Sequence, residues 1–137
     1  MNSPVTIDAS VFVSAFMPTE PGHQASKLFM LTVREQSIPI IVPVLVLPEI
    51  SAALARGQGK PELGKAFVEE LRNFPSTTFI DVDEIVADLA VDVAANHRLR
   101  GSDAIYAAVA LRFGTELITL DHEQLDRLPK VLSVRAP

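Results

Sequence analysis

Short apolar runs rich in β-branched residues alternate with longer segments of helical periodicity along almost the whole chain. Such alternation is typical of βα units, whose strands pair in parallel and whose helices cover the sheet. We therefore predict an α/β fold, a three-layer domain with a mostly parallel sheet of about five strands flanked by helices. Strands are expected at residues 5–7, 38–42, 77–82, 117–120 and 131–134, and helices at residues 11–16, 23–35, 44–56, 61–73, 84–97, 103–113 and 122–128.

Polar caps and prolines set the expected helix boundaries. Asp83 and Ser102 are predicted to cap the helices that follow them. Pro48 lies inside the predicted helix 44–56, where a proline removes a hydrogen bond and clashes with the preceding turn. This helix is therefore expected to begin later, near residue 47, or to kink just before Glu49.

Length and composition favour one compact domain, residues 1–137, with enough chain for a proper core. The hydrophobic content is 48% and the mean hydropathy is +0.27. The chain contains no cysteine, which excludes disulfides and cysteine-based zinc sites and favours a reducing compartment. The net charge of −5 argues against binding nucleic acid by bulk attraction.

No targeting or membrane segment is expected. The N-terminus, MNSPVTIDAS, has neither a basic stretch nor a long apolar stretch of the signal-peptide kind. The most apolar segment, residues 38–47, is too short to span a bilayer and contains Pro39 and Pro43. The expected location is therefore the cytoplasm, with no membrane association.

Four acidic residues stand in distinctive local settings. Asp8 and Asp121 each follow an apolar strand-like run, Asp103 opens a helix rich in alanine, and Glu49 has mostly apolar neighbours. Ligand sites of open parallel sheets form at the carboxyl ends of the strands. Carboxylates gathered there repel one another and are best accommodated around a hard cation. The sequence thus favours a divalent-metal site built from these four carboxylates.

Each acid also has an ordinary structural interpretation. Asp8 can cap the helix after the first strand, and Asp103 lies in a first helical turn, where negative charge is favoured. Asp121 with Gln124 fits a capping box, and Glu49 could lie on a solvated helix face. Taken together, these separate interpretations explain the four acids less well than a shared site does. A half-buried carboxylate in apolar surroundings needs a partner or a metal.

The chain resembles PIN-domain proteins of the kind found as the toxin half, VapC, of VapBC toxin–antitoxin modules. The resemblance covers about residues 5–134 and rests on four motifs in order, which contain Asp8 with Ser10, Glu49, Asp103, and Thr119 with Asp121. It implies a sheet of about five parallel strands and a Mg²⁺- or Mn²⁺-dependent ribonuclease. It also implies that Ser10 and Thr119 orient carboxylates or water, that RNA is the substrate, and that a small antitoxin is the partner.

The residue types are consistent with this chemistry. Mg²⁺ and Mn²⁺ prefer oxygen ligands, activate water and stabilise charge on a phosphodiester. Asp8, Asp103 and Asp121 are predicted metal ligands, and Glu49 a ligand or the group that orients the attacking water. Arg98 and Arg100 precede Asp103, so they are candidates for RNA phosphate contacts or for capping the preceding helix.

Two other functions remain open at this level. A receiver-like signalling domain also places acids at strand ends, but the one late lysine, Lys130, is poorly placed for a phosphoryl group. A PIN fold could instead serve as a non-catalytic scaffold that binds RNA or protein. Apolar helix faces around Phe16 and Phe67 are expected to be exposed and to support a homodimer or the partner's helix.

Overall fold

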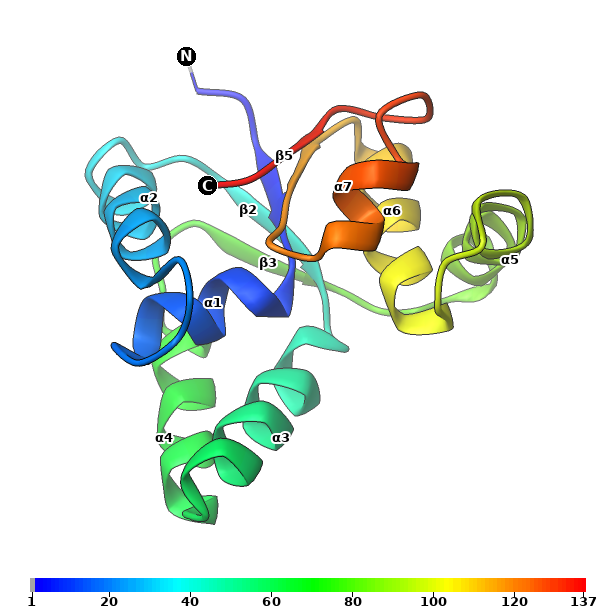
Figure 1. Ribbon diagram of the computed structural model, residues 1–137. Coiled ribbons are helices and arrows are strands. Elements are labelled where there is room, and N and C mark those ends of the chain that lie inside the picture. The colour runs from blue at the N-terminus through cyan, green and yellow to red at the C-terminus, as the bar shows by residue number, and fades with distance from the viewer. Residues whose placement is uncertain (1) are drawn as a thin grey trace.

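A single five-stranded sheet organises the molecule (Figure 1). The computed structural model describes residues 2–137. The strands run in the order β3-β2-β1-β4-β5, and every neighbouring pair is parallel. The predicted α/β class with a mostly parallel sheet is confirmed. The strands are β1 (Val5–Ile7), β2 (Ile40–Pro43), β3 (Thr77–Ile80), β4 (Glu116–Ile118) and β5 (Val134–Arg135).

Seven helices connect and cover the strands. The chain crosses the sheet in one direction from β1 through β2 to β3 and in the other direction from β3 to β4 and β5. Because such crossovers are right-handed, the helices of the two groups of connections lie on opposite faces of the sheet. The first four helices accordingly group together, away from α5 and α6 (Figure 1). The helices are α1 (Ala9–Phe16), α2 (His23–Glu35), α3 (Val46–Gln58), α4 (Pro61–Arg72), α5 (Glu84–His97), α6 (Gly101–Phe113) and α7 (His122–Arg127).

The direction of the chain across the sheet reverses between β1 and β4. These strands are direct neighbours with Ile7 opposite Ile118, and the Asp8 N–H donates to the Ile118 carbonyl at 2.9 Å. Helix α1 leaves the end of β1 and α7 leaves the end of β4. Such a switch point opens a crevice outside the carboxyl ends of the strands, which is where ligands bind in open α/β sheets.

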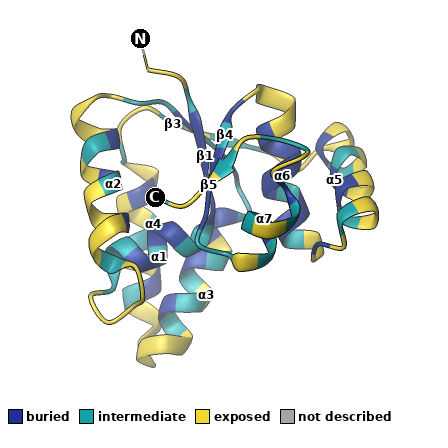
Figure 2. Ribbon diagram, turned by 45° about the horizontal axis from the view of Figure 1, so that its top comes forward, coloured by how far each residue is buried: buried dark blue, intermediate teal, exposed yellow. Residues whose placement is uncertain are grey.

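Helix α6 forms the centre of the core on one face of the sheet (Figure 2). It contacts β1, β2 and β4, and small side chains let it approach the strands closely. Tyr106 is the largest fully buried side chain on this helix. The other residues of α6 that are buried are Asp103, Ala104, Ala107, Ala108, Val109 and Ala110.

Three local predictions were wrong. Val131 and Leu132 do not belong to a strand, because their N–H groups bond back to the Leu128 carbonyl and close the turn after α7. Ser102 is not an N-cap, since α6 begins at Gly101 and Arg100 holds the cap position. The ends of β2, β3 and β4 are displaced slightly from the predicted ones, whereas β1 has the predicted bounds.

The question of Pro48 is resolved by the start of α3. This helix begins at Val46, so Pro48 is its third residue. N–H groups in the first helical turn have no partner within the helix, and a proline there costs no internal hydrogen bond. Glu49 consequently lies at the beginning of a regular helix, one residue after the proline.

The predicted exposure of the apolar faces around Phe16 and Phe67 is found only in part. Both rings are partly buried and stack on each other with their centroids 4.5 Å apart. The receiver alternative is excluded by the strand order, because receivers follow the order 2-1-3-4-5. No helix in residues 2–137 combines the length and the apolar character needed to cross a bilayer.

Candidate active site

The structure brings Asp8, Glu49, Asp103 and Asp121 together around one open pocket at the switch point. Each acid comes from a different element: Asp8 follows β1, Glu49 lies on α3, Asp103 lies on α6, and Asp121 precedes α7. The same pocket is lined by Ser10 and by the basic residues Arg56, Arg100 and His122. Segments far apart in sequence therefore converge on one acidic site with a basic border.

Asp8 is a buried carboxylate at the N-terminus of α1. Its Oδ2 accepts a hydrogen bond from the Ser10 N–H at 3.0 Å, which makes it the N-cap of that helix. Its Oδ1 accepts a longer bond of 3.4 Å from the Gln124 side-chain amide. Burial raises the pKa of Asp8 above its usual value even though these hydrogen bonds oppose the rise, and Asp121 adds repulsion.

Asp121 caps α7 through its Oδ1, which accepts from the Gln124 N–H at 2.9 Å. The hydroxyl oxygens of Ser10 and Thr119 shape the segment before it. Ser10 accepts from the Leu120 N–H at 3.1 Å, and Thr119 accepts from the Asp121 N–H at 3.0 Å. Each hydroxyl oxygen thus accepts a hydrogen bond from a backbone N–H, and its proton remains available to donate. The predicted capping function of Asp121 is present together with its position in the pocket.

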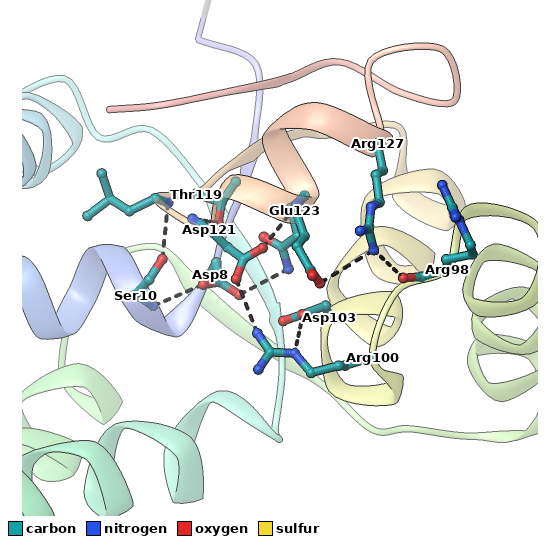
Figure 3. Close-up of polar contacts among 11 residues, drawn as sticks. Asp8, Ser10, Arg98, Arg100, Asp103, Thr119, Asp121, Glu123 and Arg127 are labelled. Atoms are coloured by element: carbon teal, nitrogen blue, oxygen red, sulfur yellow. Dashed lines mark hydrogen bonds and ion pairs between the residues drawn. The ribbon is translucent and has the colours of Figure 1, made fainter.

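Asp103 and Asp121 share one arginine (Figure 3). The Nε of Arg100 donates to Asp103 Oδ2 at 3.1 Å, and its Nη2 donates to Asp121 Oδ2 at 3.3 Å. The Asp103 side chain is only 11% exposed. Burial, followed by repulsion from Asp121, raises the pKa of Asp103, and the arginine only partly offsets this rise.

Glu49 is held by a buried tyrosine. The Tyr106 hydroxyl donates to Glu49 Oε1 at 2.6 Å. Burial is the main reason why the pKa of Glu49 is raised, repulsion by Asp8 and Asp103 adds to it, and the Tyr106 hydrogen bond opposes it. Burial also raises the pKa of Tyr106 well above its ordinary value, so this hydroxyl remains a donor at neutral pH.

Sequence reasoning missed two side chains of the site, and one of its two candidate arginines lies outside the pocket. Tyr106 and Gln124 stand three residues after Asp103 and Asp121, a spacing that puts them on the same helix faces as those acids. That spacing was the available signal. Arg98 does not line the pocket; it ends α5 in a left-handed conformation (φ 54°), as its capping alternative implied.

The donor chemistry of the pocket fits a hard divalent cation. All four acids offer oxygen ligands, and three of them have raised pKa values from burial and mutual repulsion, which a cation would relieve. The buried Gln124 Oε1 has no hydrogen-bond partner among the described residues. Within residues 2–137, however, no three His, Cys, Asp or Glu side chains stand close enough together to hold an ion in their present positions.

Comparisons with known proteins agree with this architecture. The family model described as "PIN domain" matches residues 5–131. A search of curated protein sequences finds no match. Similar solved structures include VapC20 of Mycobacterium tuberculosis, described as a "Sarcin-Ricin loop cleaving toxin", with a TM-score of 0.75, 17% identity and coverage of 97% of this chain and 99% of that one.

Two further similar structures come from other bacteria. VapBC2 of Rickettsia felis, bound to a fragment of its promoter DNA, has a TM-score of 0.74 and 13% identity, with coverage of 97% of this chain and 98% of that one. FitAcB of Neisseria gonorrhoeae has a TM-score of 0.70 and 15% identity, with coverage of 95% of both chains. At these identities the similarity concerns the fold.

Proposed function

The chain belongs to the PIN domain family, and on that premise we propose that it is a divalent-metal-dependent endoribonuclease that acts as the toxin of a toxin–antitoxin pair. The observation that carries the proposal is the convergence of four carboxylates from four elements on one pocket at the switch point of the sheet. Their burial and mutual repulsion disfavour the ionised forms when no cation is present. Such a costly arrangement is typical of a functional site.

Asp8, Asp103 and Asp121 are the proposed ligands of Mg²⁺ or Mn²⁺, and Glu49 is a fourth ligand or the group that orients the attacking water. The ion, when bound, would make water a better nucleophile and stabilise charge on the phosphodiester. Tyr106 holds Glu49 in one orientation, and Gln124 does the same for Asp8. Ser10 and Thr119 fix the backbone that carries Asp121 and keep hydroxyl protons for a carboxylate or for water.

The proposed substrate is single-stranded or loop RNA, whose phosphates and bases are accessible in a way that duplex RNA does not allow. The protein carries a net charge of −5, so a polyanion needs local positive charge to approach. Arg56 and Arg100 border the pocket and can supply part of it. The similar M. tuberculosis toxin is described as cleaving the sarcin-ricin loop, an RNA substrate of the class proposed here.

The proposed partner is a small antitoxin, because the similar structures include one described as a toxin–antitoxin complex, from Klebsiella pneumoniae, and VapBC2 of Rickettsia felis. An acidic pocket is a suitable receptor for an arginine of that partner, since guanidinium groups pair well with carboxylates. Self-association as a homodimer is part of the same proposal.

One observation favours a second candidate, a PIN domain that binds RNA or protein without cutting it. As arranged, the acids do not form a ready-made group of three around an ion within residues 2–137. A scaffold that has lost catalysis would be expected to bind RNA without any requirement for metal.

RNA cleavage by the purified protein with Mn²⁺, Mg²⁺ or EDTA separates the two candidates. We expect metal-dependent cleavage that falls by about 100-fold or more in Asp103→Asn, since even residues behind a metal ligand typically contribute 10- to 100-fold. The matched control is Asp88→Asn, an exposed acid on α5, which should cleave normally. Full activity of Asp103→Asn, or cleavage in EDTA, would refute the proposal.

A further inference from the structure

One side chain of the pocket is already a cation in contact with two of the proposed ligands. Arg100 reaches from the N-cap of α6 to Asp103 on the same helix and to Asp121 before α7 (Figure 3). It bonds the Oδ2 atom of each carboxylate. The guanidinium thus links the two helix starts that bring these acids into the pocket.

The exposure of the three side chains differs sharply. The Arg100 side chain is 72% exposed, whereas those of Asp103 and Asp121 are 11% and 20% exposed. The guanidinium therefore approaches the carboxylates from the solvent side. An ion pair with so exposed a member contributes little to stability, so it can open without disturbing the fold.

The backbone of Arg100 is fixed independently of its side chain. Its carbonyl accepts the Ala104 N–H at 3.0 Å, and its φ and ψ angles of −63° and 153° are ordinary extended values. A change in the side-chain rotamer is enough to release both carboxylates, and no change in α6 is required. Arg100 would remain at the border of the pocket after such a movement.

A divalent ion and the guanidinium need the same oxygen atoms. The Oδ2 lone pairs of Asp103 and Asp121 that face Arg100 are among the donors that Mg²⁺ or Mn²⁺ would use, and a second cation at that position would be repelled.

We propose that Arg100 is an internal competitor of the metal: it occupies Asp103 and Asp121 when divalent cations are scarce and is displaced when the site loads. The inference rests on the proposed function in taking the pocket to be a divalent-metal site. Arg100 thereby sets the metal concentration at which the site fills. Its effect is on ion binding, apart from any contact with RNA.

Calorimetric titration with Mn²⁺ alone, in the absence of RNA, tests the inference. Arg100→Gln and Arg100→Ala should each bind Mn²⁺ about fivefold or more tightly than the unmodified protein, which is the lower end of typical coupling between sites. Arg56→Gln is the matched control, because Arg56 lines the same pocket and makes no ion pair among the described residues. Its effect should be clearly smaller.

The possible results separate the inference from the proposed function. Equal or weaker Mn²⁺ binding by both Arg100 variants overturns the inference and leaves the nuclease proposal standing. An equal gain in Arg56→Gln also overturns it, because the effect would then be general electrostatics. Tighter binding in the Arg100 variants without RNA cleavage by any form supports the inference and refutes the nuclease. Absence of Mn²⁺ binding in every form overturns both.

Discussion

At the scale of single residues, two acids of the site have both a structural and a proposed chemical function. Asp8 and Asp121 cap helices, as their sequence settings predicted, and both also face the pocket. The acids could be found from sequence because each directly follows a strand or opens a helix. Tyr106 was harder to find, because its spacing of three residues from Asp103 is equally typical of a core position and its partner Glu49 lies 57 residues away.

The raised pKa of Asp8 leads to a prediction about stability without metal. A carboxyl group whose pKa is higher in the folded state than its ordinary 3.8 favours folding below that value, and this contribution is lost as the pH rises through the raised pKa. The metal-free Asp8→Asn variant should therefore melt a few degrees above the unmodified protein at neutral pH. Asparagine retains the ability to cap α1.

Thermal melts in EDTA across pH 3–7 check this prediction. The difference between the two proteins should shrink as the pH falls through the raised pKa of Asp8 toward 3.8 and change no further below it. Asp88→Asn on the exposed face of α5 should melt like the unmodified protein. Added Mn²⁺ should reverse the order by stabilising only the protein with Asp8. A destabilised Asp8→Asn variant at neutral pH would show that the ionised carboxylate favours folding.

At the scale of elements, the sequence predicted the strands and helices but not all of their ends. The alternation of β-branched and amphipathic segments is a local signal, and it identified β1 to β4. The last strand was misplaced because Val131 and Leu132 are as apolar as strand residues, while their N–H groups close a turn against Leu128. The pattern of apolar residues does not show whether a backbone N–H will bond within a local turn or to a neighbouring strand. That choice depends on contacts in the folded chain.

Helix α3 carries Glu49, and its position depends on a close contact with α4. A Cβ atom added at Gly64 would lie 2.7 Å from the Ser51 carbonyl oxygen, so Gly64→Ala must push the two helices apart. Overpacking of this kind typically costs about 1–3 kcal/mol. We expect this loss in the free energy of unfolding, together with reduced cleavage because Glu49 is displaced.

Urea denaturation of a matched pair measures the effect. Gly57→Ala, on the same helix as Glu49, meets nothing within 4 Å and should be neutral or slightly stabilising. If Gly64→Ala is as stable as the unmodified protein, the close contact between α3 and α4 at Gly64 does not constrain the two helices.

At the scale of the whole molecule, an acidic protein is proposed both to cut a polyanion and to be held inactive by a partner. Both proposals place their key contacts in one pocket, where carboxylates meet a metal ion or an arginine of the antitoxin. The family could be inferred from the order of the four motifs along the chain. Each motif lies next to the carboxyl end of the parallel sheet, so the order of the motifs follows the order of the βα units. The identity of the partner leaves no comparable pattern in this chain.

The shared pocket predicts that Asp121→Ala weakens the antitoxin complex by at least about tenfold, the equivalent of one charge-assisted hydrogen bond, and also abolishes cleavage. Asp83→Ala is the matched control, because Asp83 also caps a helix but lies outside the pocket. Co-expression with any small protein encoded by a neighbouring reading frame, followed by size-exclusion chromatography, measures formation of the complex. An RNA cleavage assay on the same variants measures activity. If no complex forms and expression alone leaves growth and RNA intact, the toxin proposal fails.

The central claim is that four carboxylates from four elements form one divalent-metal site. Anomalous diffraction from crystals soaked in Mn²⁺ tests it most directly. The account predicts a manganese peak in the pocket, contacted by Asp8 and by Asp103 or Asp121, with Arg100 turned away from both aspartates. A pocket without a peak at saturating Mn²⁺, or a peak bound elsewhere on the molecule, would contradict it.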